Sequence, residues 1–548
     1  MLKKTLLLYI ALTALSLIGC AKRGTITGGA KDTIPPYITG SSPKNMTTNF
    51  KGKEIHIDFN EYIKIKDINK QLIISPPLKY QPDITPQGSA SRFINIKIKD
   101  TLAENTTYSF NFGQSITDNN EGNPYSQFKF IFSTGDYIDS LQLKGGIKDA
   151  YARETDNFVT VMLYEATETF NDSTVYKEKP RYVTNTLDSL TTFSLENLKA
   201  GKYYLFALKD AGNNYKYDPK SDKIAFRKEP VMVPNDSTYQ LKLFKQKGDF
   251  KALKPSLASS NRLYLGYEGG DARGTTVVVK NGQGTEVIPS KLTKVADKDS
   301  LQIWLPRKLP ADSLQVQVTH RDSIRDFIVK LKEIKASDSL KISAVQTGGL
   351  HFRERFTLTS LTPLTAIDST KIRLIDKDSI ALTYRYAYDE LKQELVFDFN
   401  KEEEQKYVFT LMPGALTDFY EKQNDTLNYK LSTRSYTDYG NMFLTLDNVL
   451  RFPAIVELTD EKGKVYATAY TEGKTKINFE AIEPNKYLVR LIYDDNKNRE
   501  WDTGDYMKKI QPEEVIYLSK DTNSTEPKLI DVRANWDVEE RFFAGGTD

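Results

Sequence analysis

The sequence of 548 residues has one cysteine, three histidines and three tryptophans. With one cysteine the chain forms no internal disulfide, so its domains must be held by burial, to which 32 Tyr and 27 Phe contribute. The histidines, His56, His320 and His351, lie far apart, with no second histidine or cysteine at ligand spacing. This pattern argues against zinc and Cys/His chemistry.

Signatures of catalysis are missing as well. The nucleophile-elbow, HExxH and phosphate-loop patterns do not occur in the sequence. A hydrolase built on paired carboxylates stays open, because acidic residues are frequent and their pairing depends on the fold. We therefore predict a protein that is not an enzyme and requires no cofactor.

Positive and negative charges nearly balance. Lys and Arg number 76 against 73 Asp and Glu, a net charge of +3, which argues against a nucleic-acid partner. After the first twenty residues, no run approaches the ~20 apolar residues of a membrane-spanning helix. The charged fraction of 27% and mean hydropathy of -0.50 predict a soluble ectodomain.

The N-terminus has the pattern of an exported, lipidated protein. Lys3 and Lys4 precede an apolar run from Leu6 to Ile18, which ends at small Gly19 and Cys20. This resembles a bacterial lipobox, so residues 1–19 are predicted as a signal peptide and Cys20 as the first mature residue. The resemblance implies several acyl chains, palmitate among them, because one chain binds a membrane only marginally.

The residues after Cys20 bear on the location. They lack the acidic cluster of surface-exported Bacteroidota lipoproteins and an Asp adjacent to Cys20 that favours inner-membrane retention. We expect an outer-membrane protein on the periplasmic face. Residues 20–36, rich in Gly and Thr and ending in Pro35-Pro36, are predicted to be a tether.

Alternating apolar and polar residues predict an all-β chain of tandem β-sandwiches. In residues 37–136, Ile55 to Phe59 and Ile94 to Ile98 alternate with period two. With Phe59-Asn60-Glu61, Tyr108 and the closing Phe132-Ser133-Thr134, this segment resembles a bacterial Ig-like domain of the SbsA type.

Residues 137–246 contain Phe193 to Tyr203, a strand, a short turn and another strand, and resemble a transthyretin-like, carboxypeptidase-regulatory sandwich. Residues 247–261 break the periodicity and are interpreted as a linker. Residues 262–336 are predicted as a β unit that resembles no known family. Transthyretin-like modules accompany enzymes without being enzymes.

The chain then repeats itself. Leu395 to Phe399 and Ser432-Thr433 follow the order seen in the first Ig-like segment, which predicts a second Ig-like domain at residues 337–435. Ile477 to Tyr487 echoes the segment from Phe193 to Tyr203 and predicts a second transthyretin-like sandwich at residues 436–535. Residues 536–548 are left as a tail.

The whole chain is similar to a family of Bacteroidota envelope lipoproteins, and the resemblance implies architecture and location without an activity. A tethered structural or adhesive scaffold of the cell envelope is the preferred interpretation, with envelope proteins or glycans as partners. An envelope glycan- or peptide-binding module is the alternative, and an accessory subunit of an envelope enzyme is a third.

One loop has the spacing of a calcium site. Oxygen-bearing side chains or a backbone carbonyl stand at loop positions 1, 3, 5, 7, 9 and 12. These residues are Asp494, Asn496, Asn498, Glu500, Asp502 and Asp505. Position 6 is Arg499 rather than Gly, so affinity should be modest, and a metal-free hairpin turn rich in Asp and Asn is the alternative. The loop from Asp210 is a weaker version.

Asp-Ser or Asp-Thr followed by an apolar residue or Thr recurs along the chain. The tripeptide is similar to the O-glycosylation acceptor of Bacteroidota envelope proteins, which makes Ser140, Ser300 and Ser313 candidate acceptors. The alternative is that Asp-Ser closes a turn through hydrogen bonds to the backbone before the next strand begins.

Overall fold

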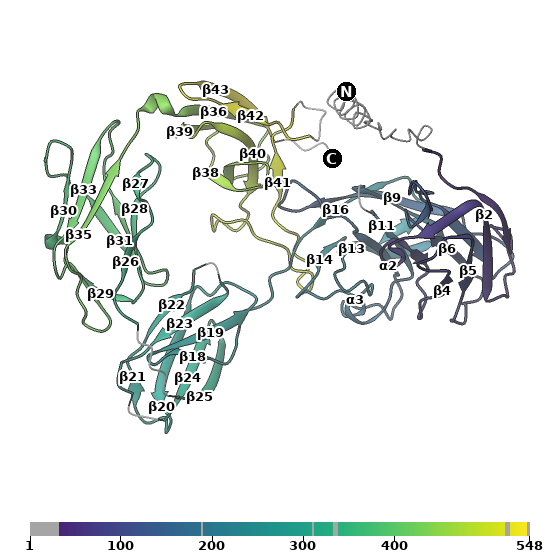
Figure 1. Ribbon diagram of the computed structural model, residues 1–548, viewed down its shortest axis with the longest axis horizontal. Helices are drawn as coiled ribbons and strands as arrows, with labels where there is room; N and C mark the ends of the chain where they lie inside the picture. The colour runs from purple at the N-terminus through teal and green to yellow at the C-terminus, as the bar shows by residue number, and fades with distance from the viewer. Residues whose placement is uncertain are drawn as a thin grey trace, which may run out of the picture. The chain divides into compact units, whose positions relative to one another are not determined.

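The computed structural model describes residues 32–187, 190–296, 298–309, 312–332, 338–520 and 526–544. The predicted signal peptide and Cys20 lie outside these residues. Strands dominate every part described (Figure 1), so the all-β fold class predicted from the sequence is confirmed. Within the described ranges, no helix is both long and apolar enough to span a membrane.

The chain divides into two compact units, one ending at Ser140 and one running from Leu141 to Asp548. The first unit holds one β-sandwich and the second unit holds four. We number them as the first to fifth sandwich in chain order.

In the first sandwich, sheet β1-β2-β5-β4, with β7 on β2, faces sheet β3-β6-β8. Alternation of apolar residues buries Ile55, Ile57 and Phe59 of β2 against Phe110 and Phe132. The elements are β1 (Ile38–Ser42), β2 (Glu54–Ile65), α2 (Ile68–Gln71), β3 (Ile73–Ser75), β4 (Asp83–Thr85), β5 (Ser91–Lys97), β6 (Thr107–Asn111), β7 (Ile116–Asp118) and β8 (Lys129–Ser133).

In the second sandwich, sheet β11-β10-β13-β14, with β15 on β13, packs on sheet β12-β9-β16. The last strand, β16, runs parallel to the first strand, β9. The elements are β9 (Leu141–Asp149), β10 (Thr160–Glu165), α3 (Thr174–Lys177), β11 (Tyr182–Asn185), β12 (Thr192–Leu198), β13 (Gly201–Lys209), β14 (Lys223–Phe226), β15 (Val231–Val233) and β16 (Thr238–Leu243).

The third sandwich pairs sheet β17-β19-β23-β22, with β18 on β19, with sheet β21-β20-β24-β25. Its strands are β17 (Lys251–Ala252), β18 (Ser256–Ser259), β19 (Arg262–Glu268), β20 (Thr275–Asn281), β21 (Val287–Ile288), β22 (Lys291–Lys294), β23 (Ser300–Trp304), β24 (Ser313–His320) and β25 (Ser323–Lys330).

The fourth sandwich has sheets β26-β28-β32-β31 and β27-β35-β33-β30, with the pair β29-β34 beside them. The elements are β26 (Ile342–Ala344), β27 (Gly348–Gly349), β28 (Phe356–Ser360), β29 (Leu364–Ile367), η1 (Ser369–Lys371), β30 (Ile372–Ile375), β31 (Arg385–Asp389), β32 (Glu394–Asp398), β33 (Lys406–Leu411), β34 (Leu416–Asp418) and β35 (Leu427–Ser432).

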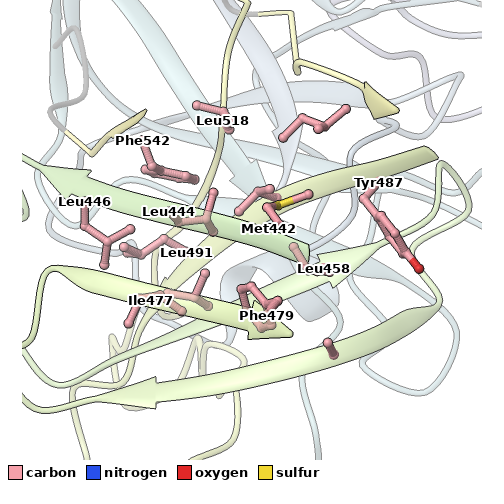
Figure 2. Packing of buried hydrophobic residues seen from close by; sticks show 14 of the residues in the cluster. Met442, Leu444, Leu446, Leu458, Ile477, Phe479, Tyr487, Leu491, Leu518 and Phe542 are labelled. Carbon is pink, nitrogen blue, oxygen red and sulfur yellow. The ribbon is translucent and has the colours of Figure 1, made fainter. Parts of the chain in front are cut away.

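The fifth sandwich has sheets β38-β37-β40-β41, with β42 on β40, and β39-β36-β43. Figure 2 shows its core, in which Met442 and Leu444 of β36 pack with Phe479 of β39, Leu491 of β40 and Phe542 of β43. The elements are η2 (Tyr436–Asp438), β36 (Gly440–Asp447), β37 (Ala454–Thr459), β38 (Val465–Thr471), β39 (Lys476–Ile482), β40 (Asn485–Tyr493), β41 (Val515–Tyr517), β42 (Ile530–Val532) and β43 (Asp537–Phe543).

The fifth sandwich repeats the second strand for strand. Each of β9 to β16 has a counterpart in β36 to β43 with the same neighbours, and in both sandwiches the last strand is parallel to the first. The first and fourth sandwiches share the order of seven strands, β1-β2-β5-β4 with β3-β6-β8 in the first and β26-β28-β32-β31 with β30-β33-β35 in the fourth. This is the organisation expected when a pair of domains has been duplicated.

Two of the predicted boundaries are wrong. The segment at residues 247–261 is not a linker, because β17 and β18 pair with β19 and Ala252 is buried in the third core. Most of the predicted tail is a strand, because residues 537–543 form β43, which pairs in parallel with β36 and buries Phe542 completely. β17 and β18 have two and four residues, too few to show a periodicity, and β43 buries only one of its seven residues, so none of them is recognisable in the sequence.

Candidate functional site

The loop that was predicted to bind calcium leaves the end of β40, a central strand of the fifth sandwich. The Asp494 side chain is fully buried at its start. The two oxygens of its carboxylate accept hydrogen bonds from the backbone N–H groups of Asn498 (3.0 Å) and Arg499 (2.9 Å). Arg499 adopts the left-handed conformation, with φ of 65°. The carboxylate therefore closes the loop from inside.

A second carboxylate holds the two ends of this loop. Glu513 Oε1 accepts from the backbone N–H of Asp495 (2.8 Å), and its Oε2 accepts from that of Asp502 (3.0 Å). The indole N–H of Trp501 donates to the Glu513 carbonyl (3.0 Å). Burial, together with the charges of Asp502 and Asp494, raises the pKa of Glu513. The sequence analysis missed this residue, because it lies beyond the spacing of a calcium loop.

The structure brings most of the predicted calcium ligands together. The Asn496 and Asn498 amides both donate to the same oxygen of Asp502, the latter over 2.6 Å. The Asp505 carboxylate is engaged elsewhere, by Lys508 (3.0 Å) and Gln246 (3.3 Å). Among the described residues, no three His, Cys, Asp or Glu side chains are gathered to hold a metal ion.

Glu500 was expected to contribute its backbone carbonyl to the calcium site. Its side chain instead makes a two-pronged pair with Arg273 of the third sandwich, at 2.9 and 2.7 Å. Both side chains are largely exposed, and exposed pairs contribute little to stability. This contact therefore leaves the Glu500 carbonyl available and adds little to the fold.

The loop after β13 in the second sandwich has the same construction. Asp210 Oδ2 accepts from the backbone N–H groups four and five residues further on (2.8 and 2.7 Å). Asp222 accepts from the N–H groups of Ala211 (3.0 Å) and Asp218 (2.8 Å), which are the positions that Glu513 holds in the fifth sandwich. The two loops are counterparts, each closed by one Asp and held by one carboxylate.

The loops differ in length at a single place. Asp222 follows Asp218 by four positions, whereas Glu513 follows Asp502 by eleven. The loop of the fifth sandwich therefore carries seven additional residues, and they fall in the segment 503–512. We call this segment the plug loop.

The plug loop inserts one aromatic side chain into the second sandwich. Tyr506 is 0% exposed, and its hydroxyl donates to the Asp172 carbonyl (3.2 Å). Lys509 lies over the Tyr506 ring at 3.9 Å and pairs with the Asp172 carboxylate. Burial raises the pKa of Tyr506. The four rings around it, with centroids 5.3 to 6.3 Å away, are Tyr176, Phe206, Tyr217 and Phe226.

Hydrogen bonds from side chains of the plug loop to backbone carbonyls fix it on the second sandwich. Thr503 donates to the Lys245 carbonyl (2.8 Å), and Gln511 donates to the Phe226 carbonyl (2.9 Å). At Gly504 a Cβ would lie 2.7 Å from the Phe244 ring and 2.8 Å from a backbone carbonyl oxygen. Only glycine fits at this close approach.

A buried arginine makes a second contact between these sandwiches. Arg490 of β40 is 1% exposed and pairs with Glu457 of the neighbouring strand (2.7 Å). Its guanidinium lies 4.0 Å from the ring centre of Tyr151 and donates to the hydroxyl of that residue. Burial alone would lower the pKa of Arg490, but Tyr517 and Glu457 outweigh it and raise the pKa. Trp501 stacks at an angle on Tyr151, at 4.6 Å.

The plug loop, together with the contacts of Arg490 and Trp501 with Tyr151, joins the second and fifth sandwiches, which belong to the same compact unit. We call this pair of contacts the clasp. The residues that meet in the clasp are separated by more than 250 residues in the chain. The clasp consists of buried aromatic, ionic and hydrogen-bonded contacts, so it is an interface between two sandwiches.

The predicted glycan acceptors lie at strand starts. Ser140 is exposed and directly precedes β9, while Ser300 and Ser313 are partly exposed first residues of β23 and β24. The carboxylate of Asp139, before Ser140, accepts a hydrogen bond from the Thr107 hydroxyl (2.9 Å). The predicted lipidation site, Cys20, lies outside the described residues.

Comparison with known proteins bears on the first sandwich. Residues 32–134 match the family described as bacterial Ig-like domain. The first sandwich is therefore a bacterial Ig-like domain, and the chain is a tandem array of β-sandwiches that begins with it. A search of curated proteins finds no match.

Solved structures resemble the chain only distantly. The S-layer protein rSbsC(31-844) is 11% identical, with 90% of this chain and 68% of that chain covered and a TM-score of 0.15. The BSP domain of a biofilm associated protein is 10% identical, with coverage of 75% and 99% and a TM-score of 0.14. Bacteroides ovatus SGBP-B, in complex with a mixed-linkage heptasaccharide, is 11% identical, with coverage of 71% and 93% and a TM-score of 0.15. At these scores the likenesses carry no argument about function.

Proposed function

We propose that the protein is a non-enzymatic scaffold of the cell envelope, held to the periplasmic face of the outer membrane by acyl chains on Cys20. The clasp is the observation that supports a scaffold most directly. It joins two duplicated sandwiches through a buried tyrosine and a buried arginine, so part of the array is braced internally. The anchor rests on the sequence pattern before Cys20.

The loop that starts at Asp494 is proposed to bind calcium with modest affinity. Asp494, Asn496, Asn498 and Asp502 already lie in one turn, and rotation of the two amides would present their oxygens in place of their N–H groups. Calcium takes 6–8 oxygen ligands. A bound ion would brace the loop from which the plug loop continues.

We also propose that Ser140, Ser300 and Ser313 carry O-linked glycans. Each is exposed or partly exposed at the start of a strand, where a glycan would extend away from the core. Glycans at these positions would cover the surfaces of a periplasmic scaffold.

The scaffold role can be tested in the native host. If it is correct, loss of the gene should weaken the envelope against detergent and osmotic stress. Strains carrying Cys20→Ser, which removes the anchor, or Tyr506→Ala, which opens the clasp, should resemble the deletion strain. The matched control is Tyr386→Ala, because Tyr386 of β31 lies in the fourth sandwich and its side chain is 41% exposed. Full envelope resistance with the clasp variant would refute the scaffold role.

A further inference from the structure

A cleft of about 610 Å³ lies between the fourth and fifth sandwiches, away from the clasp. The fourth sandwich contributes the segment after β27 and the end of β35, and the fifth contributes parts of β38 and the turn between β39 and β40. Ligand sites commonly have volumes of ~300–1,000 Å³. The side chains that carry its chemistry are His351, Arg353, Glu354, Arg434, Tyr466 and Glu483.

Charges in the cleft cancel. Arg434 pairs with Glu483 and donates to the Tyr439 hydroxyl (3.1 Å). Arg353 donates to a backbone carbonyl of the fifth sandwich (3.2 Å) and lies over the Phe479 ring at 5.7 Å. Glu354 also lines the cleft. Two positive and two negative side chains therefore face a ligand, which disfavours a phosphate or another strong anion.

His351 adds a neutral donor. Its Nδ1 accepts from the backbone N–H of Arg353 (3.0 Å), so in the neutral ring the proton lies on Nε2. This Nε2 is buried and has no hydrogen-bond partner within the described residues. Burial lowers the pKa of His351 and keeps the ring uncharged at neutral pH. A buried donor without a partner costs free energy that an acceptor on a ligand would recover.

Tyrosine supplies the apolar part of the cleft. Tyr466 of β38 is 40% exposed, and its ring is held edge-on against Tyr487 at 5.6 Å. Tyr487 is in turn fixed by the bond from its hydroxyl to the Glu483 carbonyl (2.6 Å). The ammonium group of Lys464 lies 4.8 Å from the centre of the Tyr466 ring. Tyr466 therefore presents a supported ring beside one cation and beside paired, planar polar groups.

These features suit an uncharged ring that bears many hydroxyl groups. The C–H groups of a sugar face carry partial positive charge and match the negative face of an aromatic ring, while hydroxyls both donate and accept. We propose that the cleft binds a short stretch of neutral oligosaccharide, with one sugar ring against Tyr466. The Nε2–H of His351 is buried in this structure, and a small shift of the His351 ring would bring it to a sugar hydroxyl. A scaffold needs no ligand, so this site goes beyond the proposed function, and either can fail alone.

The test is calorimetric titration of the full mature chain with cellohexaose, maltohexaose, xylohexaose and chitohexaose, with hexagalacturonate as the charged comparison. We expect at least one neutral sugar to bind, with an affinity that salt does not change. Tyr466→Ala should weaken binding about tenfold, as expected when an aromatic contact is lost. Tyr386→Ala, which removes an equally exposed tyrosine outside the cleft, should bind as the wild type does.

Three results would overturn the proposal: no binding of any neutral sugar at millimolar concentration, equal binding by Tyr466→Ala, or preferred binding of hexagalacturonate that falls with salt. Because Tyr466 is a surface residue, Tyr466→Ala should melt at the wild-type temperature, which separates lost binding from lost folding. His351→Gln offers an independent check, since it keeps a donor of similar reach and should retain more affinity than His351→Leu.

Discussion

Removing the Tyr506 side chain should open the clasp while the five sandwiches stay folded. The ring is fully buried among four aromatic side chains from the second sandwich. Truncating a buried aromatic side chain to alanine costs ~3–5 kcal/mol. The cost falls on the contact between the second and fifth sandwiches, because Tyr506 belongs to a loop outside the fifth core.

The size of this effect can be converted into a population. Each ~1.4 kcal/mol is a factor of ten in an equilibrium constant, so Tyr506→Ala should shift the ratio of closed to open clasp by roughly two to three and a half orders of magnitude. Tyr506→Phe keeps the ring and loses only the hydrogen bond to the Asp172 carbonyl. It should cost ~1 kcal/mol and leave the clasp mostly closed.

Hydrogen exchange measured by mass spectrometry would detect the opening. In Tyr506→Ala, amides of the plug loop and of residues 172–176 should exchange faster by about the same factor as the change in population, whereas amides of β36 and β10 should exchange unchanged. Small-angle scattering should show a larger radius of gyration. If neither exchange nor radius differs from the wild type, the clasp is not what holds these sandwiches together.

Four further predictions follow from other contacts. Arg490→Met should destabilise the chain to denaturant by ~3–5 kcal/mol because it leaves Glu457 buried without a partner, and adding Glu457→Gln should recover much of that loss; a double variant no better than the single would contradict the ion-pair account. Burial lowers the pKa of His351 from 6.5, so its contribution to stability is present above pH 6.5 and lost as the pH falls through the lowered pKa; urea unfolding at stepped pH should show this loss, and His351→Gln should lack it. Millimolar calcium should stabilise the full chain by up to ~2.7 kcal/mol at a hundredfold excess over Kd, seen as a higher melting temperature than in chelator; Asp494→Ala should lack this difference, and superimposable wild-type melts in calcium and in chelator would exclude the ion. The three serines proposed as glycan acceptors should add sugar masses to protein from the native host, and an intact mass equal to polypeptide plus lipid would leave them unmodified.

Period-two alternation made the sandwiches predictable, because a strand with one buried face must bury every second side chain. Ile55, Ile57 and Phe59 of β2 are buried as this rule requires. The rule failed where strands are very short: β17 has two residues and buries only Ala252. A strand of this kind is held by backbone pairing with β19, which leaves no mark on the pattern of side chains.

The candidate site was only half predictable for a different reason. Alternate oxygen side chains from Asp494 onward identified the turn, since such residues bond to nearby backbone N–H groups. No local pattern marks Arg490, Glu513 or Tyr506. Arg490 stands among apolar residues in a strand predicted to be buried, and Glu513 and Tyr506 act through partners that the fold brings close. Tyr151, the partner of Arg490, is 339 residues away in the chain.

The seven additional residues of the plug loop make the contact between the duplicated sandwiches one-way. The second sandwich, whose loop stays short, presents the aromatic cavity, and only the fifth carries a tyrosine to fill it. A contact of this kind joins two different surfaces, and in an opened molecule both surfaces become free. Two opened chains could then exchange plugs and form a swapped dimer. Partial unfolding at high concentration, followed by refolding and size-exclusion chromatography, should yield dimer from the wild type and none from Tyr506→Ala, because the variant has lost the side chain that an exchanged contact needs. Dimer formation by the variant at the wild-type level would show that another surface mediates the exchange.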